Sequence, residues 1–368
     1  MYVRKRIGAC KKRLIWRRLK NVIACLLATI MMVSSSSGTV MAKQSKRVST
    51  LYLYSNPIPQ EVNDYAYKNF NSVIESLPEV EVAIIDQEIG NIYYGSGFEF
   101  NSIYYYPINI NDHIVALLSI NKEQDGTYSW SLSKDFAEEL DAIGKNTNQN
   151  NPARLKISNN VLYAITEDNI FSLCNNVFSD DVTDTSKHVV NLKTYCYKNC
   201  IVKSLKSRLA DSKYLALDRS EIQSDRPWCV AYCVAQILRY KGYSSETANG
   251  IMSYFNPNVD YNGEPLRWDQ AETYARRFGL YPSYFQGTMD EGNVQREICL
   301  GKPICLDCIS TLGKNKTHAV VLRGYNNNNH TYSIWNPWYA YYTTMSANAK
   351  SFTGEGTGFT WANTMRGW

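Results

Sequence analysis

Hydrophobic and polar residues alternate along much of the first half of the chain. An alternation with period two is typical of half-buried β-strands. Four segments share it: VEVAIIDQ, IYYYPINI, HIVALLSI and TYSWSLS. KEQDGTY (122–128) reads as a hairpin turn, and DFAEELDAI (135–143) is the one short helical patch. The pattern therefore predicts a strand-rich α+β module over residues 43–205.

Polar stretches interrupt this module without supplying a catalytic cluster. The Asn-rich 145–152 and the acidic 179–187 are typical of linkers. His113 and His188 stand alone in the sequence, with no Cys or acidic cluster at catalytic spacing. We therefore interpret both histidines as ordinary surface or core residues.

The periodicity changes in the second half, where apolar residues recur at helical spacing after Cys229. Val230, Cys233 and Val234 begin the apolar face, and Gly242 ends it. A cysteine at a helix N-terminus meets unpaired backbone N–H groups and the positive end of the helix dipole, which favour a thiolate. We therefore predict Cys229 as a nucleophile with a lowered pKa, and Cys233 as a packing residue.

A thiolate nucleophile needs a base, and His318 is the best of the four histidines. It opens the strand-like run HAVVLRGY, which is followed by NNNN and then by a second run that ends in NPW. A hairpin that pairs Tyr325 with His330 would place Asn336 beside His318. His330, in the turn, is the weaker candidate for the base.

Gln223 lies six residues before Cys229 and is the candidate oxyanion donor. If the loop folds back over the helix start, its side-chain amide and the Cys229 backbone N–H could bind the oxyanion of a tetrahedral intermediate. A single Gln carries little weight alone. The prediction depends on its position relative to Cys229, His318 and Asn336.

Charge and hydropathy at the start of the chain indicate a leader. Residues 1–42 hold nine Lys and Arg and no acidic residue. Within them, a basic stretch is followed by a short apolar run and then by small residues up to Ala42. We expect a secretion signal there; the alternative, a membrane anchor, would need about 20 apolar residues. Without the leader the net charge of +5 becomes −4, so no basic face for nucleic acid is expected.

Residues 202–218 join the two halves and are polar and basic. The segment suits a processing site after Lys203, Lys206, Arg208 or Lys213. An ordinary connection between domains would have the same composition, so both interpretations stay open.

Taken in order, QSDRPWC, WCVAY, HAVV and IWNPW resemble the papain-like cysteine proteases, and most closely the staphopain family of secreted bacterial enzymes. ANGIMSYFNPN and the closing FTWANTMRGW agree with the same family, over about residues 221–368. The resemblance implies roles for Cys229 as nucleophile, His318 as general acid/base, Asn336 as its orienter and Gln223 as oxyanion donor. It also implies that Trp338 shields the His/Asn pair, with Trp228 as a further supporting aromatic residue.

The resemblance further implies an α+β, two-lobed papain-like protease domain over residues 206–368. One lobe would be helical and the other a β-barrel-like sheet. It would follow a propeptide domain (43–205) that blocks the cleft of a secreted zymogen. The expected reaction is hydrolysis of peptide bonds in proteins or peptides, with no metal, no organic cofactor and no stable membrane insertion after the leader is removed.

Other functions stay open from sequence alone. A Cys/His amidase or peptidase acting on cell-wall peptides has the same Cys-before-His order. A transglutaminase-like acyl transferase would more usually carry Asp in place of Asn336. A degenerate protease used for binding would normally lack one of the four site residues, and all four positions are filled.

The remaining cysteines allow more than one interpretation. Cys196, Cys200, Cys305 and Cys308 have spacings that could bind zinc. We favour instead a buried strand through Cys299, Cys305 and Cys308, in which the thiols pack as small apolar groups. In an exported protein, disulfides involving Cys174, Cys196 or Cys200 are also open.

Overall fold

The structure is a computed structural model that describes residues 50–80, 92–175, 177, 181–194, 197–198, 211–224, 226–257, 264–311 and 316–368. Residues Ser49–Trp368 form one compact unit. The predicted leader, 1–42, lies outside the described residues. We call residues 50–198 the N-terminal part and residues 211–368 the C-terminal part.

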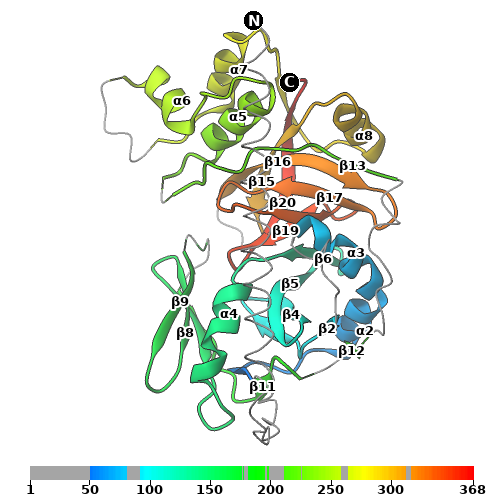
Figure 1. Ribbon diagram of the computed structural model, residues 1–368, viewed down its shortest axis with the longest axis vertical. Coiled ribbons are helices and arrows are strands. Elements are labelled where there is room, and N and C mark those ends of the chain that lie inside the picture. Colours follow the sequence, from blue (N-terminus) through cyan, green and yellow to red (C-terminus); the bar gives the residue numbers. More distant parts are fainter. Residues whose placement is uncertain are drawn as a thin grey trace, which may run out of the picture. The chain divides into compact units, whose positions relative to one another are not determined.

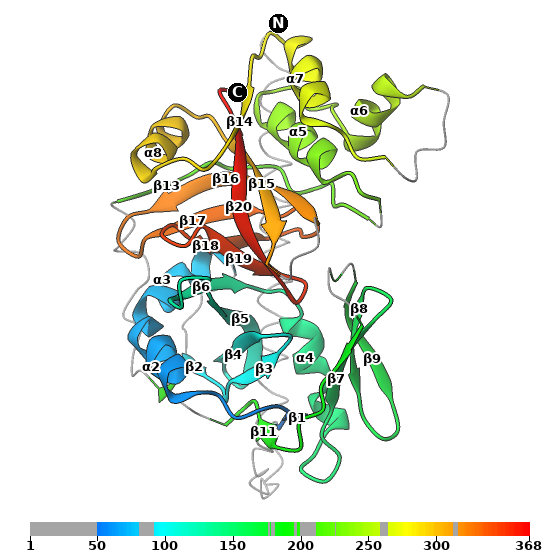
Figure 2. The same cartoon turned by 180° about the vertical axis from the view of Figure 1, so that it is seen from behind.

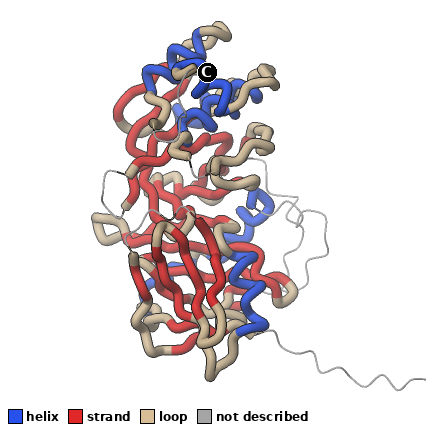
Figure 3. Tube along the Cα trace, turned by 90° about the vertical axis from the view of Figure 1, so that its left-hand side faces the viewer, coloured by secondary structure: helices blue, strands red, loops and turns tan. Residues whose placement is uncertain are grey.

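The N-terminal part is rich in strands, as predicted (Figure 3). In chain order its elements are β1 (Tyr52–Tyr54), α2 (Gln60–Lys68), α3 (Phe70–Val80), β2 (Ile92–Tyr94), β3 (Phe98–Phe100), β4 (Ile103–Ile110), β5 (His113–Lys122), β6 (Tyr128–Ser133), α4 (Ala137–Ile143), the 3₁₀ turn η2 (Gly144–Asn146), β7 (Arg154–Ser158), β8 (Val161–Ile165), β9 (Ile170–Asn175), β10 (Val182–Thr183), β11 (Val189–Asn191) and β12 (Tyr197–Lys198).

Three of the four predicted strands correspond to β4, β5 and β6, and the predicted turn joins β5 to β6. The helical patch corresponds to α4. The fourth segment, VEVAIIDQ, lies outside the described residues except for Val80, the last residue of α3.

The prediction of a single helix was wrong, because α2 and α3 are also helical. Their buried residues Val62, Ala66, Val73 and Leu77 recur every four residues, which is helical spacing. The second predicted linker is also not purely a linker, since Val182 and Thr183 form β10 and pair with β7.

The C-terminal part carries helices against a sheet. Its elements are β13 (Ser212–Tyr214), α5 (Cys229–Tyr240), α6 (Ala248–Phe255), α7 (Trp268–Arg276), β14 (Ser283–Gln286), α8 (Glu291–Cys299), β15 (Ile304–Ser310), β16 (Thr317–Asn326), β17 (Thr331–Trp335), β18 (Tyr342–Ser346), β19 (Ser351–Gly354) and β20 (Thr357–Arg366). Figure 1 shows α5, α6 and α7 grouped on one side of these strands.

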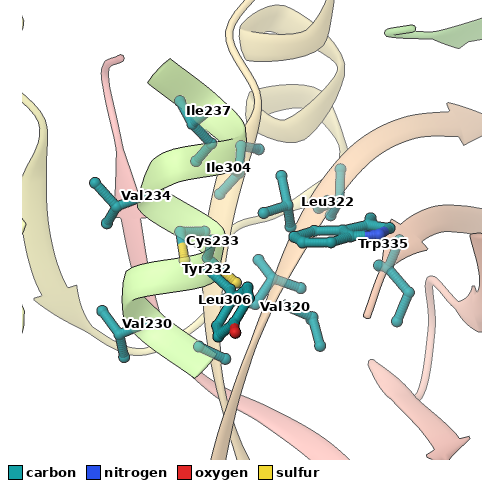
Figure 4. Packing of buried hydrophobic residues seen from close by; sticks show 14 of the residues in the cluster. Val230, Tyr232, Cys233, Val234, Ile237, Ile304, Leu306, Val320, Leu322 and Trp335 are labelled. Atoms are coloured by element: carbon teal, nitrogen blue, oxygen red, sulfur yellow. The ribbon is translucent and has the colours of Figure 1, made fainter. Parts of the chain in front are cut away.

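The core of the C-terminal part lies between α5 and the sheet. Cys233, Val234 and Ile237 of α5 are fully buried, as are Leu306 of β15 and Val320 of β16. Figure 4 shows these side chains packed into one cluster. Burying such side chains stabilises the fold by about 1.5–3 kcal/mol each, and it also fixes the helix N-terminus relative to β16.

The main sheet runs through both parts. Its path is β12-β2-β4-β5-β6-β18-β17-β16-β15-β20-β14, with β6 joined to β18 at Leu132 and Thr344. Figure 2 shows β6 beside β18 and β19. The helical and β-rich sides expected of the protease domain are present. The barrel-like closure is absent among the described strands, because the path stays open with β12 and β14 at its two ends.

None of the helices in the described part of the chain is long and apolar enough to cross a membrane.

Candidate active site

Cys229 is the first residue of α5, as the sequence predicted, and Trp228 occupies the N-cap position. Trp228 is buried, its carbonyl accepts the Tyr232 N–H at 3.0 Å, and the Arg226 guanidinium lies 4.5 Å from its ring centroid. Tyr240 ends the helix, and Gly242 follows with a φ of +99°, a conformation that favours glycine. The buried indole thus fixes the chain at the point where Cys229 enters the helix.

His318 and Asn336 lie together at the ends of adjacent strands. His318 Nε2 is 2.9 Å from Asn336 Oδ1, and both side chains are buried. The hairpin register differs from the predicted one, because Asn326 pairs with Thr331 and the loop is therefore 327–330. An irregularity between Leu322 and Gly324 shifts the pairing by one residue, so the two side chains still meet.

Trp338 covers this pair. Its ring stacks on the imidazole of His318 with centroids 3.8 Å apart and an angle of 15° between the planes. Its backbone N–H donates to Asn336 Oδ1 at 3.1 Å. Phe359 packs against the rings of both His318 and Trp338. The amide oxygen is thus fixed by two contacts and shielded from water, as the resemblance implied.

The sulfur of Cys229 lies against the strand that carries His318. The backbone N–H groups of Ala319, the next residue, and of Val230 both donate to it. Since His318 Nε2 faces Asn336, Nδ1 is the ring nitrogen left to exchange a proton with the thiol. The structure therefore places Cys229, at the start of α5, against β16, the strand that carries His318.

Both reacting groups are neutral near pH 7 in this structure. Burial raises the pKa of the Cys229 thiol to about 11, although its two N–H donors oppose the shift. Burial also lowers the pKa of His318 to about 4, against the opposing effect of Asn336. The lowered thiol pKa expected from the sequence is thus wrong for this form, because desolvation outweighs the helix N-terminus.

Gln223 is held next to these residues from two directions. Its backbone N–H donates to the Pro337 carbonyl at 2.7 Å, and its Nε2 donates to the Arg226 carbonyl at 2.7 Å. Its Oε1 is buried and has no hydrogen-bond partner among the described residues. One amide hydrogen remains available for an oxyanion.

The sequence analysis missed a second set of residues beside this site. A Cβ at Gly354 would lie 3.1 Å from Asn336 Nδ2 and 3.7 Å from Trp338. Glu355 follows it and is buried, and none of the sequence motifs includes it. Its flanking glycines in TGEGTG were the available signal for a tight turn at a crowded position.

Among the other cysteines of the described residues, Cys233, Cys305 and Cys308 are buried close to Cys229. Cys305 and Cys308 are buried in β15, as favoured, but Cys299 ends α8 and is exposed, so its placement in a buried strand was wrong. Cys196 and Cys200 lie outside the described residues, and Cys174 is a free thiol. No group of three or more His, Cys, Asp or Glu suited to a metal occurs in the described part of the chain.

His113 and His330 are surface residues. His113 Nδ1 lies 2.9 Å from Asp141 Oδ2 with its side chain 73% exposed. His330 lies in the hairpin loop at a φ of +51°, with Nδ1 3.6 Å from Glu291. Neither histidine occupies a position like that of His318.

A cysteine at a helix start, against the strand that carries a histidine paired with an asparagine, fits a papain-like cysteine peptidase in broad terms. Residues 218–364 match the model of the Peptidase_C39 like family. This match supports a cysteine peptidase family for these residues, and it does not extend to the staphopains in particular.

One solved structure that is similar to the chain is a putative C39-like peptidase from Bacillus anthracis. It is 14% identical and aligns over 42% of this chain and 96% of its own, with a TM-score of 0.30. The search of curated proteins found no match.

Proposed function

We propose that the chain is the precursor of a secreted papain-like cysteine endopeptidase. Cys229 is the nucleophile, His318 the general acid/base, Asn336 its orienting partner and Gln223 the oxyanion donor. The observation that carries the proposal is the 2.9 Å contact between His318 and Asn336, beside a sulfur that accepts the N–H of Ala319.

The proposed reaction follows from these contacts. His318 Nδ1 takes the thiol proton, and the Cys229 sulfur attacks the peptide carbonyl, forming a tetrahedral oxyanion. Gln223 Nε2 and the Cys229 backbone N–H stabilise that oxyanion. The imidazolium then protonates the leaving amine, and water hydrolyses the thioester with His318 as base.

We further propose that residues 43–205 act as a propeptide in a staphopain-like organisation, after residues 1–42 direct secretion. A cavity of about 640 Å³ supports this role, because it is lined by Gln223 and Trp338 on one side and by Lys134, Asp135 and Glu139 on the other. Segments of the N-terminal part thus stand where a substrate would approach.

The test uses residues 43–368 with Cys229 intact or changed to Ala, incubated with reductant and an epoxide inhibitor of cysteine proteases. We expect inhibitor on Cys229 and digestion of casein after trimming, and neither in the Cys229→Ala protein. His318→Ala should lower kcat/KM by about 10²-fold or more while the fold persists. His330→Ala, a surface histidine, is the matched control and should change little.

Three outcomes would contradict the proposal. Labelling of Cys233 would identify a different sulfur. Digestion of cell-wall peptides without casein would point to the Cys/His amidase, and unchanged casein digestion in the His318→Ala protein would exclude that histidine as the base.

A further inference from the structure

The cavity beside Gln223 and Trp338 holds a carboxyl group of the N-terminal part. Asp135 enters it from the residue stretch just before α4, and the facing wall comes from Tyr339, Tyr341 and Glu355 of the C-terminal part. The Asp135 carboxylate therefore contacts a surface that belongs to the proposed peptidase domain.

That surface offers several hydrogen-bond donors to one oxygen. The Glu355 backbone N–H is shared between Asp135 Oδ1 at 2.9 Å and the Tyr339 hydroxyl oxygen at 2.8 Å. The Tyr339 hydroxyl in turn lies 3.3 Å from Asp135 Oδ1. The Gly356 N–H also donates to this carboxylate. These donors stay with the C-terminal part, so any group that replaces Asp135 must supply an oxygen acceptor.

The donors are presented by a tight turn of unusual composition. Gly354 pairs with Thr357, which leaves Glu355 and Gly356 as the two turn residues between β19 and β20, with φ values of +48° and +69°. Asn or Asp is the usual first residue of such a turn, and a long side chain there is disfavoured. A non-glycine residue in this conformation beside a candidate active site is a reason to look for function.

Glu355 also brings an unused acceptor. Its side chain is 6% exposed, and its Oε2 has no hydrogen-bond partner among the described residues; the same holds for Asp135 Oδ2. The wall therefore carries hydrogen-bond donors together with a buried carboxyl oxygen of Glu355.

The charged and titratable groups around this pair make a second negative charge unfavourable. Burial, followed by the charge of Asp135, raises the pKa of Glu355 to about 9. Burial also raises the pKa of Asp135 to about 7, with a smaller contribution from Glu139. The other groups that face the pair or line the cavity are Lys134, Glu138, Cys174, Tyr105, Tyr339 and Tyr341.

We propose that Tyr339 and the Glu355–Gly356 turn form a side-chain subsite that selects a carboxamide, as in asparagine, in peptides cut at Cys229. The amide oxygen accepts from the Tyr339 hydroxyl and the turn N–H groups, and the amide NH₂ donates to Glu355 Oε2. Asparagine has the shape of Asp135, which fills the subsite in this structure. The inference rests on the proposed function.

The first experiment needs no catalysis and uses residues 43–368 with Cys229→Ala. Unfolding by urea is measured at pH 5 and pH 8 for Asp135→Asn, Asp135→Ala, and Asp168→Asn, an exposed matched control. At pH 8 we expect a higher midpoint for Asp135→Asn and a lower one for Asp135→Ala. The gain for Asp135→Asn should shrink at pH 5, because burial raises the pKa of Asp135 to about 7 and the side chain is then already uncharged. A lower or unchanged midpoint for Asp135→Asn at pH 8 would overturn the inference.

The second experiment measures specificity with the active enzyme obtained from the full chain. Peptide mixtures carry Asn, Asp, Ala or Lys at each position around the cut. At one position we expect Asn to be preferred over Asp by about tenfold or more at pH 8. Glu355→Leu, which removes the side-chain acceptor, should abolish that preference.

The two possible failures are distinguishable. If peptides are cut with no such position, or if Glu355→Leu leaves the preference unchanged, the subsite is wrong and the protease remains. If no peptide is cut, the proposed function fails, and the unfolding series alone decides whether the pocket prefers a carboxamide.

Discussion

At the scale of single residues, Asn336 decides how the imidazole of His318 is held. Its Oδ1 contacts Nε2 at 2.9 Å, and its Nδ2 is buried without a partner among the described residues. Asn336→Asp keeps the shape and adds a negative charge, which favours the imidazolium. We therefore expect the pKa of His318 to rise from about 4 by at least about one unit.

The measurement is the pH dependence of inactivation by iodoacetamide in the active enzyme. The part of this pH profile that depends on protonated His318 should move to higher pH in Asn336→Asp. Asn348→Asp, at an exposed position, should leave the profile unchanged. A profile that does not move in Asn336→Asp would show that this amide does not set the protonation of His318.

Residue types and spacing were enough to name the site candidates but not their protonation. The predicted hairpin placed Asn336 beside His318 even though Tyr325 pairs with Tyr332 and not with His330. The neutral state of Cys229 could not be predicted in this way, because desolvation depends on every element packed around the sulfur. Glu355 was missed because its role depends on Asp135, 220 positions away.

At the scale of elements, β13 contains one of the predicted processing sites, Lys213. Lys213 pairs with Tyr325 of β16, and Tyr214 pairs with Gly324. A Cβ at Gly324 would lie 2.3 Å from Tyr214 Cδ1 and 2.6 Å from the Lys213 carbonyl oxygen. Cleavage after Lys213 therefore requires β13 to leave the sheet.

Gly324→Ala should displace β13 and destabilise the C-terminal part by about 1–3 kcal/mol, the usual cost of overpacking. Limited trypsin digestion should then yield a fragment that begins at Tyr214, identified by mass spectrometry, faster than in the unaltered chain. Gly292→Ala is the control, because its Cβ would meet its nearest atom at an ordinary 3.4 Å. Equal cutting after Lys213 in both variants would contradict protection by β13.

The same scale shows what alternation and helical spacing can and cannot reveal. β4, β5 and β6 were predicted from period-two patterns, although β4 and β5 are buried on both faces, with Tyr105 and Leu117 in one core and Tyr106 and Leu118 in another. The pairing of β6 with β18 had no such signal, since it joins segments more than 200 residues apart through Leu132 and Thr344. Long-range pairing depends on the packing of the whole chain, which local patterns do not record.

At the scale of the whole molecule, the contact of β5 and β6 with β19 is formed largely by small polar groups. Asn121 Nδ2 donates to Thr353 Oγ1 at 3.1 Å, the Thr353 N–H donates to Ser131 Oγ at 3.0 Å, and Ser129 and Ser351 share a hydrogen bond of 2.9 Å. Surfaces between separable domains are more polar than cores. This composition supports an N-terminal part that can be released.

Release should change the chemistry of Cys229, which gives a prediction for the whole chain. With a thiol pKa of about 11, the thiolate fraction at pH 7 is about 10⁻⁴. In the untrimmed chain, we therefore expect the rate of Cys229 alkylation to rise about tenfold per pH unit up to pH 10. After proteolytic trimming it should level off near neutral pH, as water reaches the sulfur and its pKa falls. Alkylation of each cysteine is measured by mass spectrometry. Cys299 is the internal standard, because it is exposed and should react at the same rate in both forms. Identical Cys229 profiles before and after trimming would show that the N-terminal part does not keep the nucleophile neutral.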